Sequence, residues 1–219
     1  MGNSFHFSSF LIRHSLLNKS YIMLTDRFAS ALVYAHQLHI NQVRKGSNIP
    51  YISHLLSVAA LVLEDGGDED EAIAALLHDA VEDCGGTPIL TEIRTRFGER
   101  VAHLVAHCTE SETIPKPPWK ARKQRYLEQL KTGDASVYRI ALADKLHNAR
   151  STLKDYRRQG DTVWQKFKGG KVGTLWFYRS ILAIQPPIEQ EESRAGASQL
   201  TEELQRIVIE LSGNLDLDI

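Results

Sequence analysis

The chain has 219 residues, of which 42% are hydrophobic and 24% are charged, and its formal net charge at pH 7 is -1. This length suits one domain with a well-buried core, and the balanced charge lacks the global basicity of a nucleic-acid-binding protein. No apolar run is long enough to span a membrane. The two cysteines, Cys84 and Cys108, have no metal-finger spacing and suit a reduced, cytoplasmic protein.

The first 22 residues contain one arginine, one lysine and five serines but no acidic residue. They lack the continuous apolar stretch of a secretory signal, although a transit peptide has a similar composition. We expect a disordered or spurious extension at 1–22, with Met23 opening the folded domain.

Helical periodicity dominates the remainder of the chain. Thr25 or Asp26 is suited to cap a first helix that reaches about Lys45, and Asp68 or Asp70 is suited to cap the helix that carries residues 71–83. Further helices are expected at 51–64, 88–97, 99–107, 118–131, 135–153, 163–183 and 200–211. No alternating strand pattern competes, so we predict an all-α fold. Residues 23–184 form the predicted domain, and 185–219 form a linker and a last helix.

The most informative stretch is LLHDAVED at 76–83, where an apolar run contains four groups able to bind or serve a metal. On one continuous helix His78, Asp79, Glu82 and Asp83 would share a side. Burying three acids and an imidazole on such a helix is costly unless a cation compensates them, and a divalent ion would do so. The alternative is a solvated helix end that carries acids.

Two further residues stand in apolar helical surroundings. His54 lies within PYISHLLSVAA, and Asp144 follows the apolar run Ile140 to Ala143. Each alone is more typical of a hydrogen-bonded core residue. Together with His78 and Asp79 they would bring nitrogen and oxygen ligands from three helices to one divalent ion.

Five sequence words now resemble one family in order. They are Arg44-Lys45-Gly46, PYISH at 50–54, LLHDAVED at 76–83, RFGERV at 96–101 and LADKLHNARS at 142–151. This series resembles the hydrolase domain of the RelA/SpoT-type alarmone enzymes, which are HD-domain metal-dependent phosphohydrolases, from about residue 29 to 182. The resemblance implies an HD-domain helical bundle. Because the chain is too short for the synthetase domain of the long bifunctional enzymes, we expect a small stand-alone hydrolase.

The resemblance also implies a metal centre with a catalytic acid pair. One divalent ion, typically manganese (Mn²⁺), would be bound by four ligands: His54, His78, Asp79 and Asp144. Glu82 and Asp83 resemble the pair that activates and orients the attacking water. A six-coordinate ion with four protein ligands keeps positions open for water and a substrate oxygen, and a nearby carboxylate can accept the proton of the water.

The implied substrate is (p)ppGpp, from which hydrolysis at the 3′ position releases pyrophosphate and gives GDP or GTP. Arg44 resembles the family's arginine over the nucleobase, and Lys45 the lysine that meets phosphate, which suits a planar guanidinium and a point charge. A basic helix end is the alternative for this pair.

Four more residues are predicted to contact the nucleotide. Asn148 lies one turn beyond Asp144, and Ser151 supplies a nearby hydroxyl. Lys116 belongs to a basic run that resembles a segment of the small alarmone hydrolases, although such a run is also typical of a solvated helix face. Tyr178 matches an aromatic position facing the nucleotide, although its periodicity equally suits a helix core.

Two other functions remain open on the sequence. A related HD phosphohydrolase would act on another nucleotide, such as (p)ppApp or NADPH. A non-catalytic helical module would only bind nucleotides, and the intact pair Glu82 and Asp83 argues against it. The sequence indicates a nucleotide partner, with no nucleic acid and no membrane, and it favours no particular oligomeric state.

Overall fold

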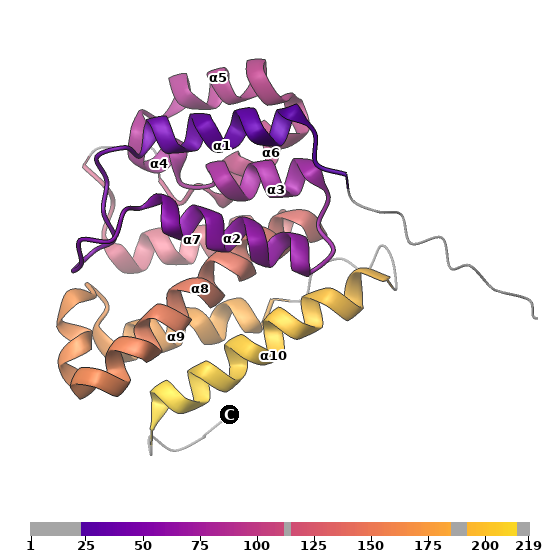
Figure 1. Cartoon of the computed structure of the whole chain (residues 1–219). Coiled ribbons are helices and arrows are strands. Elements are labelled where there is room, and N and C mark those ends of the chain that lie inside the picture. Colours follow the sequence, from indigo (N-terminus) through magenta and orange to yellow (C-terminus); the bar gives the residue numbers. More distant parts are fainter. Residues whose placement is uncertain (1–22, 112–114, 185–191, 214–219) are drawn as a thin grey trace, which may run out of the picture.

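The computed structural model describes residues 23–111, 115–184 and 192–213 (Figure 1). The predicted all-α fold is confirmed, because these ranges contain helices and one isolated β-bridge between Val43 and Pro50 but no strand. The helices are α1 (Asp26–Leu38), α2 (Ile52–Glu64), α3 (Glu69–Leu77), α4 (Ala80–Cys84), α5 (Thr87–Phe97), α6 (Glu99–Cys108), α7 (Trp119–Thr132), α8 (Ala135–Gln159), the 3₁₀ helix η1 (Gly160–Lys166), α9 (Gly170–Leu182) and α10 (Glu192–Ser212).

Helix α3 lies at the centre of the bundle, in contact with α1, α2, α6 and α8 (Figure 1). Its residues from Ala72 to Leu77 have no solvent-accessible surface. The helix begins at a capping box, in which Asp68 accepts the amide proton of Glu71 and the Glu71 carboxylate accepts that of Asp68. The buried helix therefore ends with His78 deep inside the molecule.

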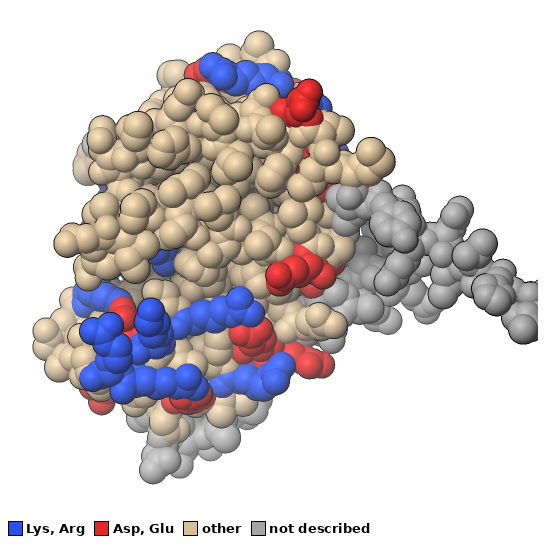
Figure 2. Space-filling view, in the orientation of Figure 1, with Lys and Arg blue, Asp and Glu red and all other residues tan. Residues whose placement is uncertain are grey.

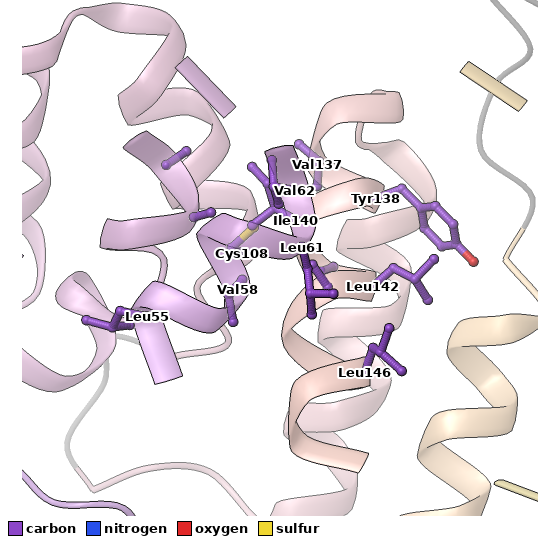
Figure 3. Packing of buried hydrophobic residues seen from close by; sticks show 14 of the residues in the cluster. Leu55, Val58, Leu61, Val62, Cys108, Val137, Tyr138, Ile140, Leu142 and Leu146 are labelled. Carbon is purple, nitrogen blue, oxygen red and sulfur yellow. The ribbon is translucent and has the colours of Figure 1, made fainter. Parts of the chain in front are cut away.

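Helices α2 and α8 pack closely beside α3, and their contact sets the relative positions of His54 and Asp144. Figure 3 shows Val58, Leu61 and Val62 of α2 facing apolar residues of α8 such as Ile140. These α2 side chains are at most 4% exposed, so the two helices are held by a dense apolar interface.

The C-terminal helix α10 packs against α8 and α9 (Figure 1). Leu204 and Leu211 have no exposed surface and belong to the same core cluster as the central helices. The predicted helix at 200–211 therefore exists, and it begins earlier than expected, at Glu192. The expected extension at 1–22 lies outside the described residues. None of the described helices has both the length and the apolar character that a membrane crossing requires.

The first predicted helix is too long. Helix α1 ends at Leu38, and the chain then forms a short hairpin in which the Arg44 amide donates to Ile49 and the Tyr51 amide donates to Gln42. Gly46 supplies the positive φ of 76° that this turn requires. Arg44 and Lys45 are therefore in a hairpin, and the alternative of a basic helix end is wrong.

The helix expected through Asp83 is interrupted. Helix α3 ends at Leu77, His78 and Asp79 form a turn, and α4 begins at Ala80. The premise that the four motif residues lie along one continuous helix is therefore wrong. The break separates the His-Asp pair from the acid pair, which occupies α4.

Candidate active site

Four predicted metal ligands converge in the interior. His54 comes from α2, His78 and Asp79 from the turn after α3, and Asp144 from α8. The His54 Nε2 atom lies 3.2 Å from Asp144 Oδ1 and 3.7 Å from Asp79 Oδ2. The His78 Nε2 atom lies 3.0 Å from Asp79 Oδ2 and 3.7 Å from Asp144 Oδ1. Two imidazole nitrogens and two carboxylates thus surround one point.

Three of these residues form the tightest group. Ligand atoms of His54, His78 and Asp144 all lie within 4.8 Å of one another, and all three residues are buried. Asp79 is close to both imidazoles but is not part of this mutual group. The carboxylate of Asp79 accepts a hydrogen bond of 2.5 Å from the Tyr51 hydroxyl, which fixes its direction.

The outer nitrogens of both imidazoles are already occupied. The Nδ1 atom of His78 donates to the Ala75 carbonyl at 2.8 Å, and that of His54 lies 2.7 Å from His147 Nδ1. Burial, with help from His54 and Arg44, lowers the pKa of His147 to about 4, so this ring is neutral and can accept from His54. The Nε2 atoms of both rings then point toward the carboxylates of Asp79 and Asp144.

The two Nε2 atoms are buried and make no hydrogen bond in the described part of the chain. A buried polar atom without a partner is costly, and an imidazole held by its other nitrogen is the usual form of a histidine metal ligand. With two carboxylates beside them, these residues fit a divalent ion.

The charges of these four side chains compensate one another. Burial alone would lower the pKa of His78, but Asp79 and Asp144 outweigh it and raise that pKa well above its usual value. Burial would likewise raise the pKa of Asp144, but Lys145 and the two imidazoles hold it well below its usual range. His78 lowers the pKa of Asp79 in the same way, against the effect of burial.

The predicted acid pair lies on α4, one turn beyond Asp79. Glu82 accepts hydrogen bonds from the Lys116 ammonium at 2.8 Å and from the Glu110 amide at 3.2 Å. Asp83 accepts from Gln42 Nε2 at 2.9 Å and lies 3.9 Å from the Lys116 ammonium. Neither acid belongs to the buried group of ligand atoms, which suits proton transfer beside a metal.

Arg44 and Asn148 lie together at the edge of the site. The Arg44 guanidinium donates to Asn148 Oδ1 at 2.7 Å, and Asn148 Nδ2 donates to Asp144 Oδ1 at 2.5 Å. The guanidinium carbon also lies 5.7 Å from the centre of the Tyr51 ring. The hairpin thus connects through Asn148 to a predicted metal ligand.

The remaining predicted substrate residues differ in position. Lys45 is exposed on the hairpin, and Ser151 is half-buried on α8. Lys116 contacts the acid pair, as described above. Tyr178 is only 4% exposed, and burial raises its pKa to about 12. It occupies a core position of α9, and its contact with a nucleotide stays a prediction.

Several residues of the site were not foreseen. Tyr51 and His147 stand inside the words PYISH and LADKLHNARS, so the motifs contained them without indicating what they contact. Gln42 precedes Arg44 in the hairpin and orients Asp83. Glu110 has no sequence signal at all, because its partner Glu82 is 28 residues away.

A family model described as an HD domain matches residues 31–175. The chain belongs to the HD-domain family. This HD domain is 36% identical over 138 residues to mouse guanosine-3′,5′-bis(diphosphate) 3′-pyrophosphohydrolase MESH1, covering 62% of this chain and 72% of that protein. The human MESH1 is 38% identical over the same length, with the same coverage. A protein of Aquifex aeolicus (strain VF5) with the same enzyme name is 38% identical over 134 residues, which are 61% of this chain but 19% of that protein.

Solved structures resemble this HD domain along most of their length. A metazoan ortholog of SpoT that hydrolyses ppGpp has a TM-score of 0.65 at 23% identity, covering 87% of this chain and 98% of its own. The protein lmo0812 from Listeria monocytogenes EGD-e has a TM-score of 0.61 at 33% identity, covering 72% and 97%. The predicted HD-domain bundle and the resemblance to RelA/SpoT-type hydrolases are thereby confirmed.

Proposed function

We propose that this HD domain is a divalent-metal-dependent (p)ppGpp 3′-pyrophosphohydrolase. The observation that carries the proposal is the convergence of two buried imidazole nitrogens, which make no hydrogen bond in the described residues, with two carboxylates next to the acid pair on α4. The names of the MESH1 relatives, of which the chain covers 72%, support the reaction and the substrate.

The ion would be held by His54, His78, Asp79 and Asp144, and we propose manganese. Mixed nitrogen and oxygen donors suit a first-row divalent ion, and the imidazoles are already oriented by His147 and the Ala75 carbonyl. Such an ion would supply Lewis acidity, which makes a water molecule more acidic and polarises a phosphoryl oxygen.

The acid pair would accept the proton of the attacking water and orient that water. Glu82 accepts the proton of the attacking water, and Asp83, held by Gln42, orients that water. Water attacks the phosphorus attached to the 3′ oxygen, the bond between this phosphorus and the 3′ oxygen breaks, and the 3′ oxygen takes up a proton to become a hydroxyl. The products are pyrophosphate and GDP or GTP.

The nucleotide would be bound by side chains around this centre. Arg44 stacks on the base, while Lys45 and Lys116 meet phosphates. Asn148 and Ser151 contact the sugar or phosphate from α8. We also propose that Tyr178 contributes to the wall of the base pocket.

The test compares purified protein with manganese on ppGpp, ppApp and NADPH, with pyrophosphate and inorganic phosphate assayed separately. We expect pyrophosphate from ppGpp, and none from a His78→Ala variant. Pyrophosphate from ppApp alone, or inorganic phosphate from NADPH alone, would assign the same site to another nucleotide. Absence of turnover on all three would contradict the proposal.

A further inference from the structure

Glu110 is a buried carboxylate that the proposed mechanism does not use. It follows α6 and is 8% exposed. Its carboxylate contacts two cations of α7, with Arg122 Nε at 3.2 Å from one oxygen and the Lys123 ammonium at the other. Its backbone carbonyl accepts a hydrogen bond from Arg125 at 2.9 Å. One residue thus attaches the first half of α7 to the end of α6.

The same residue is connected to Glu82 of the acid pair in two ways. Its backbone amide donates to Glu82 Oε2 at 3.2 Å. Its carboxylate also forms an ion pair with Arg122, whose Nη1 atom lies 3.9 Å from Glu82 Oε1. Arg122 therefore stands between a buried carboxylate and the proposed proton acceptor.

The Glu110 carboxylate compensates buried positive charge on α7. The side chains of Arg122 and Lys123 are 13% and 14% exposed, so these residues do not form a solvated helix face. Burial, and then the nearby Lys145, lower the pKa of Lys123, while Glu110 opposes that change. Lys145 is itself paired with Asp144. Without Glu110, mutual repulsion of the cations would favour displacement of α7 from the site.

We propose that Glu110 is a positioning residue that sets Arg122 beside Glu82 to receive the pyrophosphate end of the substrate. A guanidinium that is paired with a carboxylate through its Nε side can offer its terminal N–H groups to phosphate oxygens. This inference rests on the proposed function for the identity of the substrate, but the anion site itself is testable without turnover.

The experiment measures binding of inorganic pyrophosphate to manganese-loaded protein by calorimetry. The variants are Glu110→Gln, Arg122→Gln, the double variant, and Glu128→Gln as a control on the exposed side of α7. We expect each of the first two to weaken binding about tenfold, and the double variant to be no weaker than Arg122→Gln. The control should bind as the wild type does.

Turnover of ppGpp gives a second readout. Because Glu110→Gln keeps the backbone amide that contacts Glu82, we expect KM to rise about tenfold while kcat changes by less than about threefold. A Glu110→Gln/Lys123→Met variant removes the buried lysine together with its partner, so it should regain the thermal stability lost in the single variant but not the lower KM. If Glu110→Gln acted only by destabilising the fold, the second substitution would restore both the thermal stability and the wild-type KM.

Three results would overturn the inference. The first is that Glu110→Gln binds pyrophosphate as tightly as the wild type, and the second is that the losses of affinity in Glu110→Gln and Arg122→Gln multiply in the double variant. The third is that KM returns to its wild-type value in Glu110→Gln/Lys123→Met. Failure of the proposed function has a different signature. In that case the wild type would not hydrolyse ppGpp, while the coupling between Glu110 and Arg122 in pyrophosphate binding would persist.

Discussion

Asp79 and Asp144 raise the pKa of the His78 imidazole well above its usual value despite its burial, which favours the protonated ring until a metal binds. A metal ion needs the neutral ring, so binding must release this proton. The affinity for manganese should therefore rise as the pH increases from about 6 to 8. Calorimetry in two buffers of different ionisation enthalpy should also reveal proton release at pH 7. An affinity independent of pH would contradict the assignment of His78 as a ligand.

Tyr51 offers a second test at the residue scale. Its hydroxyl donates to Asp79 Oδ2 at 2.5 Å, and a Tyr51→Phe variant removes only this hydrogen bond. Loss of a hydrogen bond to a metal ligand typically weakens metal binding by about 10- to 100-fold. We expect such a loss in a manganese titration. The matched control is Tyr156→Phe, whose half-buried ring lies in α8 next to Trp164. If Tyr51→Phe bound manganese as tightly as Tyr156→Phe does, the proposed role of the Tyr51 hydroxyl would be contradicted.

The sequence indicated residue types better than it indicated contacts. His54, His78 and Asp144 were predicted as ligands from their apolar surroundings and from the resemblance, and the structure brings their ligand atoms within 4.8 Å. Contacts such as Arg44 with Asn148 join residues 104 positions apart, and neither side chain has a pattern that reveals the other. Glu110 was missed for the same reason, because a buried carboxylate is recognised only by the cations around it.

The side chain of Trp119 in α7 packs between residues at the start of α9. The indole of Trp119 packs against Gly169 and Gly173, where an added Cβ would approach the ring to 2.7 and 2.9 Å, and it meets Trp176 edge-on. A Gly173→Leu variant should therefore push Trp119 out of its site. We expect a loss of about 1–3 kcal/mol in the free energy of unfolding.

Urea denaturation measures this loss. The control is Val172→Leu on the same helix, where the side chain is 78% exposed and should tolerate the change. Equal unfolding free energies for Gly173→Leu and wild type would show that the packing of Trp119 on α9 does not stabilise the fold.

Most helices were predicted from the sequence, but their ends were predicted less well, and the single helix expected at 163–183 is instead the 3₁₀ helix η1 followed by α9. Asp68 was one of two candidate caps for α3, and its capping box is present. The end of α1 at Leu38 and the turn at His78 and Asp79 were not foreseen, because the local sequence supports a longer helix in both places. Tertiary packing decides such ends, since the hairpin and the turn after α3 contact partners far away in the chain.

The proposed metal would connect three parts of the whole molecule, namely α2, the turn after α3, and α8. An ion that binds only the folded chain raises its stability by about 2.7 kcal/mol when its free concentration is 100 times its dissociation constant. Manganese should therefore raise the melting temperature, and a chelator should reverse the rise. His78→Ala should show no such response. A similar shift in that variant would mean that the ion binds elsewhere.

The all-α architecture of the residues that the structure describes was predictable, because apolar periodicity persists through most of the sequence. The packing of α10 on α8 and α9 was not, since the residues from 185 onward have the composition of a linker followed by a helix. Ion pairs that join α8 to α10, such as Arg150 with Glu203 and Arg157 with Glu210, connect residues 53 positions apart and leave no local signal.

The most direct test measures metal content and pyrophosphate release from ppGpp in the same samples of wild type, Asp83→Asn and Asp144→Ala. An asparagine at 83 still offers Gln42 an acceptor oxygen, so this variant should retain its manganese and lose about 100-fold or more of its turnover. Asp144→Ala should lose both metal and turnover. Full activity in metal-loaded Asp83→Asn, or normal manganese content with activity in Asp144→Ala, would contradict the proposed site.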